Sequence, residues 1–167
     1  MHYKIFTLTF FLFLVANCSI WAQKSYGNLY QPEADAASEI QAALEKAATE
    51  GKHVLLQGGG NWCVWCYRFH DFIEKDEELK SMVKENYVWY HLNYSKENMN
   101  EAIFEKYGFP QRFGFPVLIV LDARGNRIHT QDSALLESGE GYDRKKVLEM
   151  LKAWTPKAVN PATYRKN

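Results

Sequence analysis

At 167 residues, the chain is long enough for one domain with a buried core. Nearly half of its residues are apolar and 15% are aromatic, which excludes an intrinsically disordered chain. Its 20 basic and 20 acidic residues balance, so no net charge attracts nucleic acid or anionic lipid. Nucleic-acid binding is therefore excluded as the main function.

The first 22 residues predict an export signal. Lys4 supplies a positive start, and the apolar run over residues 5–16 is shorter than a membrane-spanning helix needs. Cleavage after Ala22 fits this pattern. Two alternatives remain open, an uncleaved N-terminal anchor and lipidation of Cys18. The predicted location is outside the cytoplasm, in the periplasm or its equivalent, with the chain either free or lipid-anchored.

Cleavage after residue 22 would leave a domain over residues 23–155 and a C-terminal tail over residues 156–167, which we expect to be loosely ordered. The mature chain would carry a net charge of −1 and two cysteines, Cys63 and Cys66. Exported compartments permit disulfides. A pair three positions apart closes too short a loop to constrain the unfolded chain, so it is a poor structural staple and a good redox candidate.

Hydrophobic periodicity and turn residues predict the secondary structure in chain order. After a lead-in over residues 23–33, the predicted elements are a helix over 34–50, a buried strand over 53–57, a glycine-rich loop over 58–61, a long helix over 66–84, a strand over 87–92, a helix over 98–107, a strand over 117–121, a turn over 122–126, a return strand over 127–131 and a helix over 142–154. Strands that alternate with helices form parallel pairs, and a closing hairpin adds antiparallel ones. The expected fold class is therefore α/β, with a central mixed sheet flanked by helices.

The Cys63-Val64-Trp65-Cys66 segment lies between a predicted strand and a predicted helix. The first turn of a helix has unpaired N–H groups and a partial positive charge, which would stabilise a thiolate at Cys63 and lower its pKa. Cys66 lies one turn further along and should be more buried. We therefore expect Cys63 to attack a partner and Cys66 to resolve the mixed disulfide.

Other uses of the cysteines fit less well. An inert disulfide, or two buried thiols, is the plain structural alternative. A structural zinc site needs four ligands, and His70 offers only a third. Covalent haem attachment needs a histidine directly after the second cysteine, where this chain has Tyr67. No metal and no organic cofactor is expected.

Two short motifs make the chain resemble the thioredoxin superfamily, and more narrowly its exported bacterial members. They are the segment 62–66, Trp-Cys-Val-Trp-Cys, after a strand, and Phe115-Pro116 before a strand. The resemblance extends over residues 34–154. It implies a thioredoxin-like fold, with Trp62 preceding the nucleophile and a cis Pro116 facing the disulfide. It also implies that the backbone of Phe115 pairs with an extended segment of the bound partner.

The sequence departs from the family pattern at two places. Many thioredoxins have a buried acid six residues before the first cysteine, and this chain has Gln57, which cannot titrate. Proton transfer must then use water or another group, or be slower. Asp71 and Glu74 are near in sequence, but helical geometry is expected to point them elsewhere. The dipeptide Val64-Trp65 contains no histidine or other cation to support a thiolate at Cys63, which favours a reductase over a strong oxidant.

Aromatic residues are concentrated around the motif. Most are expected in the core, but we expect Trp62, Trp65 and Phe115 at the surface, where they could grip an extended polypeptide. The segment 108–114 either belongs to this rim or is a plain loop.

These features predict a thiol–disulfide oxidoreductase that acts on protein thiols or disulfides outside the cytoplasm. Its partners would be a protein substrate and a membrane-bound redox donor, and it would be a monomer that meets the membrane only through a lipid anchor. Two alternatives remain. One is a peptide-binding module with a stable disulfide. The other is a copper(I)-handling protein that uses Cys63 and Cys66, with or without His70.

Overall fold

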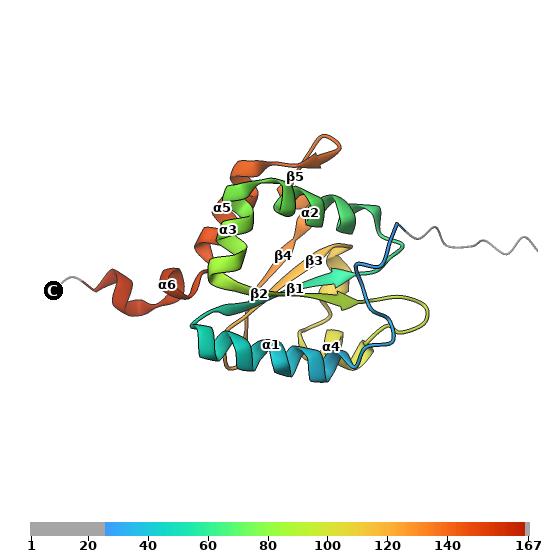
Figure 1. Ribbon diagram of the computed structural model, residues 1–167, viewed down its shortest axis with the longest axis horizontal. Helices are drawn as coiled ribbons and strands as arrows, with labels where there is room; N and C mark the ends of the chain where they lie inside the picture. The colour runs from blue at the N-terminus through green and yellow to red at the C-terminus, as the bar shows by residue number, and fades with distance from the viewer. Residues whose placement is uncertain (1–25, 166–167) are drawn as a thin grey trace, which may run out of the picture.

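A four-stranded mixed sheet forms the centre of the molecule in the computed structural model, which describes residues 26–165 (Figure 1). Its strands lie in the order β2-β1-β3-β4. β1 pairs in parallel with β2 and antiparallel with β3, and β3 continues into the β3–β4 hairpin. The strands are β1 (His53–Gly59), β2 (Tyr87–Asn93), β3 (Val117–Leu121) and β4 (Arg127–Asp132). The predicted α/β class with a mixed sheet is confirmed.

Helices cover both faces of this sheet (Figure 1). On one face lie α1 (Ala36–Glu50) and α4 (Glu101–Lys106), and on the other lie α2 (Val64–Lys75), α3 (Glu77–Asn86) and α5 (Arg144–Ala153). The central strand β3 is buried along its whole length because both of its faces are covered, which is why its sequence is a continuous apolar run rather than an alternating one.

The covered faces form two apolar cores. The core on the α2 side includes Phe69, Ile73 and Leu118, and the core on the α1 side includes Phe104 and Ile119. Neighbouring residues of β3 enter opposite cores because successive side chains of a strand point to opposite faces. A third, smaller cluster joins the two cysteines to Tyr30 at one end of the sheet.

The prediction of one long helix over residues 66–84 is wrong. Two helices, α2 and α3, meet at Asp76, whose carboxylate accepts hydrogen bonds from the backbone N–H groups of Glu78 and Leu79. Aspartate favours such caps because its side chain satisfies N–H groups that have no partner within the helix. The apolar residues Ile73 and Leu79 on either side of the break are both buried, so the periodicity alone does not reveal it.

The glycine-rich loop expected over residues 58–61 is also partly wrong, because β1 continues through Gly58 and Gly59. Both residues pair with β2, and Gly58 also pairs with Val117 of β3. A side chain at Gly58 would lie 2.9 Å from Val117 Cγ1. These glycines are therefore required for close packing within the sheet and not for a turn.

Two predicted helices begin later than expected. α4 starts at Glu101 instead of residue 98, and α5 starts at Arg144. Tyr142 belongs instead to β6 (Gly141–Tyr142), which forms a small hairpin with β5 (Glu137–Ser138). The expected ends of the α1 helix and of strand β3 agree closely with the structure.

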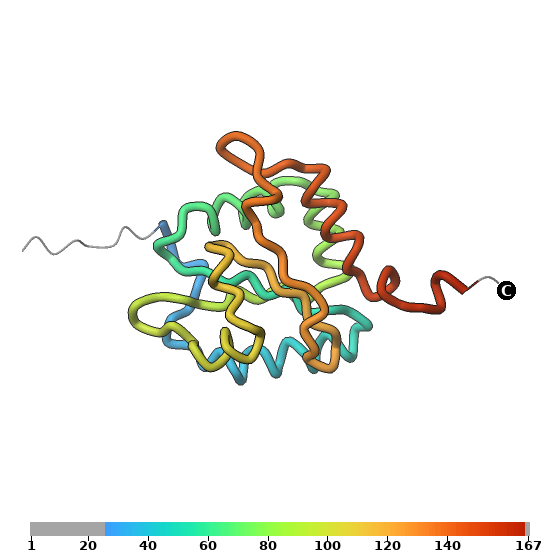
Figure 2. Tube along the Cα trace, turned by 180° about the vertical axis from the view of Figure 1, so that it is seen from behind, coloured from blue at the N-terminus to red at the C-terminus, as the bar shows by residue number. Residues whose placement is uncertain are grey.

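The C-terminal tail also differs from expectation. It forms α6 (Pro156–Val159) and a 3-10 turn, Pro161–Tyr164, rather than loose chain. Neither element contributes a buried residue. The tail extends away from the body of the molecule, at the end opposite to residue 26 (Figure 1, Figure 2).

The predicted export signal, its cleavage site and Cys18 lie outside residues 26–165. Within that range, no helix is long and apolar enough to cross a membrane.

Candidate functional site

Cys63 and Cys66 form a disulfide at the start of α2, with their Cα atoms 5.3 Å apart. Cys63 is the N-cap residue of the helix, and its Sγ accepts a hydrogen bond from the backbone N–H of Cys66 at 3.2 Å. The positive end of the helix dipole therefore points at this sulfur. Cys63 retains 5% exposure and Cys66 has none, which makes Cys63 the sulfur that an incoming partner can reach.

The strand β1 and a tight turn bring the cysteines to this end of the sheet. The backbone N–H of Cys63 donates to the carbonyl of Gly60 at 2.9 Å, which closes the turn between β1 and α2. A side chain at Gly60 would lie 2.4 Å from Trp62 Nε1, so glycine is needed for the indole to fold back over the turn. That indole donates to the carbonyl of Tyr94 at 2.8 Å.

The segment before β3 packs against the disulfide. Phe115 contacts the cluster that contains both cysteines, and its ring meets Trp62 edge to face, with the centroids 5.5 Å apart. The peptide bond between Phe115 and the buried Pro116 is cis, as the family resemblance implies.

The aromatic rim differs from the one expected. Trp62, Trp65 and Phe115 are half-buried rather than exposed. Trp65, for example, packs edge to face on Tyr142, and the guanidinium group of Arg68 lies over its ring. The exposed aromatic residues near the cis bond are instead those of the segment 108–114, Phe109 at 52% and Phe113 at 39%.

Gln57, at the position where many thioredoxins have an acid, is completely buried behind the disulfide. Its side-chain N–H₂ group donates to the hydroxyl of Tyr30 at 2.8 Å and to the backbone carbonyl of Cys66 at 3.0 Å. Burial raises the pKa of Tyr30 far above its ordinary value. Tyr30 is not predictable from the sequence, because it lies in the non-periodic lead-in, where nothing in the pattern marks a buried residue.

The acids near the motif in sequence stay away from it, as expected. Asp71 pairs with Lys75 at 2.8 Å and Glu74 with Lys80 at 2.9 Å, all with exposed side chains. His70 also points away from the cysteines.

The ring of His70 instead packs against Trp89 and His91 of β2, with centroids 5.2 and 5.1 Å away. Burial lowers the pKa of His91 to about 3, so this imidazole is neutral at ordinary pH. Across residues 26–165, no three His, Cys, Asp or Glu side chains are grouped to hold a metal ion.

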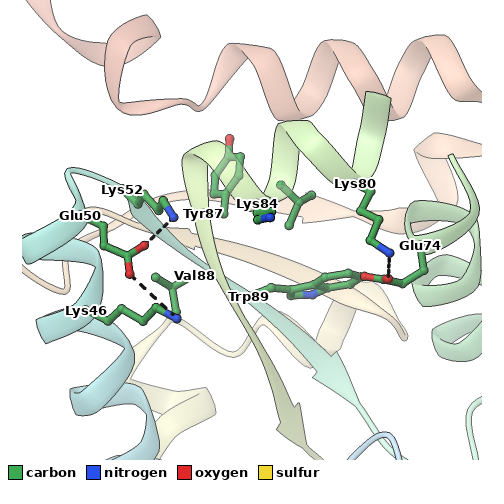
Figure 3. A pocket seen from close by; sticks show the side chains of 10 residues that line it. Lys46, Glu50, Lys52, Glu74, Lys80, Lys84, Tyr87, Val88 and Trp89 are labelled. Carbon is green, nitrogen blue, oxygen red and sulfur yellow. Dashed lines mark hydrogen bonds and ion pairs between the residues drawn. The ribbon is translucent and has the colours of Figure 1, made fainter. Parts of the chain in front are cut away.

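A pocket of about 480 Å³ lies against the edge strand β2, between the end of α1 and α3 (Figure 3). Glu50 is bridged there by Lys46 and Lys52, and Glu74 is paired with Lys80. Neither cysteine lines this pocket, so its charged side chains belong to the exposed edge of the sheet and not to the redox site.

A mixed sheet covered on both faces, a Cys-X-X-Cys disulfide at a helix N-terminus and a cis-proline before the adjoining strand define a thiol–disulfide oxidoreductase of the thioredoxin fold. A family model described as thioredoxin-like matches residues 35–123. The chain belongs to this thioredoxin-like family.

Individual relatives agree with this assignment. A protein named disulfide bond reductase DsbH, from Chlamydia pneumoniae, is 26% identical over 125 residues, which cover 66% of this chain and 74% of that protein. The crystal structure of a disulphide isomerase from Xylella fastidiosa Temecula1 superposes with a TM-score of 0.64 at 20% identity, over 74% of this chain and 93% of that one. The crystal structure of the reduced C-terminal domain of DsbD from Neisseria meningitidis superposes with a TM-score of 0.51 at 21% identity, over 70% of this chain and 94% of that one.

Proposed function

We propose that this oxidoreductase reduces disulfide bonds of proteins outside the cytoplasm, with Cys63 as the attacking thiolate and Cys66 as the resolving thiol. The observation that carries the proposal is the position of Cys63 Sγ at the N-cap of α2, where it accepts a backbone N–H while its partner sulfur is fully buried. Stabilising the anion at the outer sulfur makes it the better nucleophile at neutral pH.

The reaction consists of two exchanges. In the reduced enzyme, the Cys63 thiolate attacks one sulfur of the substrate disulfide, and the other substrate sulfur leaves as a thiolate that takes up a proton. Cys66 then loses its proton and attacks Cys63. The Cys63–Cys66 disulfide forms, and the second substrate thiol is released. The two cysteines of the enzyme are now oxidised to a disulfide, so a membrane-bound electron donor must supply two electrons before the next cycle.

Four residues around the cysteines would position the substrate. Trp62 and Trp65 flank the attacking sulfur in the sequence, and Phe115 packs on the disulfide cluster. The Phe115 backbone lies directly before the first residues of β3, where an extended substrate segment could pair with it.

Two observations support the reductive direction. Arg68 is the basic residue closest to the motif in the sequence, and its guanidinium lies 4.6 Å from the centroid of the Trp65 ring. The thiolate therefore relies on the helix terminus alone, and a strongly oxidising pair needs a thiolate with more support. The Chlamydia pneumoniae relative is also named a reductase. The export signal predicted for the first 22 residues supports the extracytoplasmic location.

The test is the equilibrium reduction potential of the Cys63–Cys66 pair in dithiothreitol or glutathione buffers, followed by tryptophan fluorescence. A value near that of thioredoxin, about −270 mV, is expected for a reductase. A value near about −120 mV would make the protein an oxidant and overturn the reductive direction. A disulfide that no buffer reduces would leave only the peptide-binding module.

A further inference from the structure

The buried cysteine has an unusual neighbour in the Tyr30 hydroxyl. A Cβ atom placed on Gly59 would lie 2.4 Å from Cys66 Sγ and 2.7 Å from the Tyr30 oxygen, so both atoms border the same small space. A side chain at residue 59 would overlap both atoms, so glycine is what lets them pack this closely against β1. Tyr30 is 1% exposed and Cys66 is fully buried, so water has little access to either.

The hydrogen bonds of Gln57 determine which way the Tyr30 proton can point. The Cys66 carbonyl can only accept, so the group 3.0 Å from it must be the amide N–H₂ and not the amide oxygen. The second N–H of that amide reaches the Tyr30 oxygen at 2.8 Å. The tyrosine oxygen is therefore an acceptor in this bond, and its own proton remains available for another acceptor.

We propose that the Tyr30 hydroxyl, oriented by Gln57, donates a hydrogen bond to Cys66 Sγ once the disulfide is reduced, and so stabilises the resolving thiolate. A disulfide sulfur is a weak acceptor and a thiolate is a strong one, so the bond forms as the site is reduced. Tyr30 and Gln57 together thereby support the resolving thiolate, and Gln57 occupies the position where many thioredoxins have a buried acid. This inference rests on the proposed roles of Cys63 and Cys66.

Among residues 26–165, few other titratable groups face this pair. They are Cys63 and Tyr67 on the α2 side, His91 on β2 and Tyr142 on β6. With a pKa of about 3, His91 stays neutral above about pH 5, and burial raises the pKa of Tyr142 well above its ordinary value. Between about pH 7 and pH 10, the titration of the resolving step therefore reports mainly on the cysteines.

The test separates the two exchanges with the chromogenic disulfide of thionitrobenzoate, in a full-length Cys18→Ser background. The first thionitrobenzoate is released when Cys63 attacks. The second is released when Cys66 loses its proton to buffer and attacks Cys63 Sγ, which breaks the bond between Cys63 and thionitrobenzoate. The rate of the second release, followed against pH, gives the pKa of Cys66.

Tyr30→Phe should slow the second release about tenfold near pH 7 and leave the first unchanged. The two proteins should converge at high pH, where Cys66 is ionised in both. A general loss of structure would not produce this convergence. The matched control is Tyr67→Phe, which removes a hydroxyl that accepts from Leu29 N–H at 3.0 Å and so holds the same N-terminal segment. Its second release should match the parent.

Identical pH profiles for Tyr30→Phe and its parent would overturn this inference and leave the proposed function intact. Absence of both releases in the parent protein would instead contradict the proposed function. If Tyr30→Phe does not fold, the test moves to the unaltered side chain. The ¹³Cζ resonance of Tyr30 should then shift between the oxidised and the reduced, ionised protein, and that of Tyr67 should not. An unchanged Tyr30 resonance would contradict the proposed hydrogen bond.

Discussion

Two sulfur atoms three residues apart have very different surroundings. Cys63 lies at a helix terminus with slight exposure, whereas Cys66 is enclosed by Tyr30 and Gln57. The difference comes from helix geometry, since the first residue of the turn is at the open end and the fourth faces the core. The proposed division between attack and resolution follows from this asymmetry.

Exchanging each cysteine for serine should give different products. Cys66→Ser should stop turnover and accumulate a mixed disulfide at Cys63, because the attack still occurs and the resolution does not. Cys63→Ser should form no such adduct, because Cys66 is fully buried. Mass spectrometry after mixing each reduced variant with a disulfide-bonded protein distinguishes the two. An adduct on Cys63→Ser and none on Cys66→Ser would reverse the assignment.

A methyl group at Gly59 should destabilise the protein. It would enter the space that Cys66 Sγ and the Tyr30 oxygen share, so Gly59→Ala should lower the free energy of unfolding by about 1–3 kcal/mol. Gly141→Ala is the matched control, since no atom lies within 4 Å of a Cβ there. Urea denaturation of both variants measures the difference. Equal midpoints for the two variants would show that the site is loosely packed.

Among the secondary-structure elements, the contact between α3 and α5 depends on Arg144. Its guanidinium reaches Asp76 at 2.6 Å and Glu78 at 2.5 Å, and thus ties the first turn of α5 to the first turn of α3. The same residue Asp76 caps α3 and separates it from α2. The Asp76 carboxylate thus caps the start of α3 and also joins α3 to α5.

Arg144→Gln should lower stability in a pH-dependent way. Hydrogen bonds from Arg144 hold the pKa values of Asp76 and Glu78 below their ordinary range. Groups with a lowered folded-state pKa stabilise the fold above their unfolded pKa, and this contribution is lost as pH falls through the folded value. The variant should melt about 2 °C lower at pH 7 and match the parent in strong acid.

The control for that experiment is Lys145→Gln, which removes an exposed pair with Glu149 at 3.8 Å on the same helix. It should leave the melting temperature unchanged at every pH. A deficit in Arg144→Gln that persists in strong acid would show that the arginine acts through packing rather than charge.

Across the whole molecule, the sheet ends at two edge strands, β2 and β4, and other parts of the chain pack against each of them. β2 is flanked by the charged side chains of the pocket in Figure 3, which discourage pairing with another chain. On β4, His129 stacks on Trp154 with the ring centroids 4.2 Å apart, and His53 contacts the backbone carbonyl of Trp154 at 2.9 Å. The end of α5 is thereby fixed to the sheet.

Truncation should therefore find a sharp boundary near Thr155. A chain that ends at Thr155 should melt within about 2 °C of the full chain, because no residue of α6 or of the following turn is buried. A chain that ends at Lys152 loses the Trp154 contacts and should melt several degrees lower. Thermal unfolding by circular dichroism measures both. A large loss on removing residues 156–167 alone would mean that the tail is part of the domain.

Local patterns were sufficient for several features. The apolar run of β3, the helix that ends at Gly51 and the β3–β4 hairpin each follow from neighbouring residues, because periodicity and glycine act over a few positions. The spacing of Cys63 and Cys66 between a strand and a helix likewise predicted the redox pair and the more buried member.

Long-range packing decided the rest. Whether Gly58 and Gly59 form a loop or a strand depends on what packs against them. Val117, which lies opposite Gly58, is distant in sequence, and Cys66, which lies against Gly59, is on the far side of the turn that follows β1. Tyr30 becomes part of the site because the N-terminal segment folds over it, 27 residues before Gln57. The sequence by itself determined the cysteine chemistry, since that depends on residue type and local spacing. Only the tertiary structure decided what surrounds the buried sulfur, since burial and hydrogen bonding depend on contacts between distant segments.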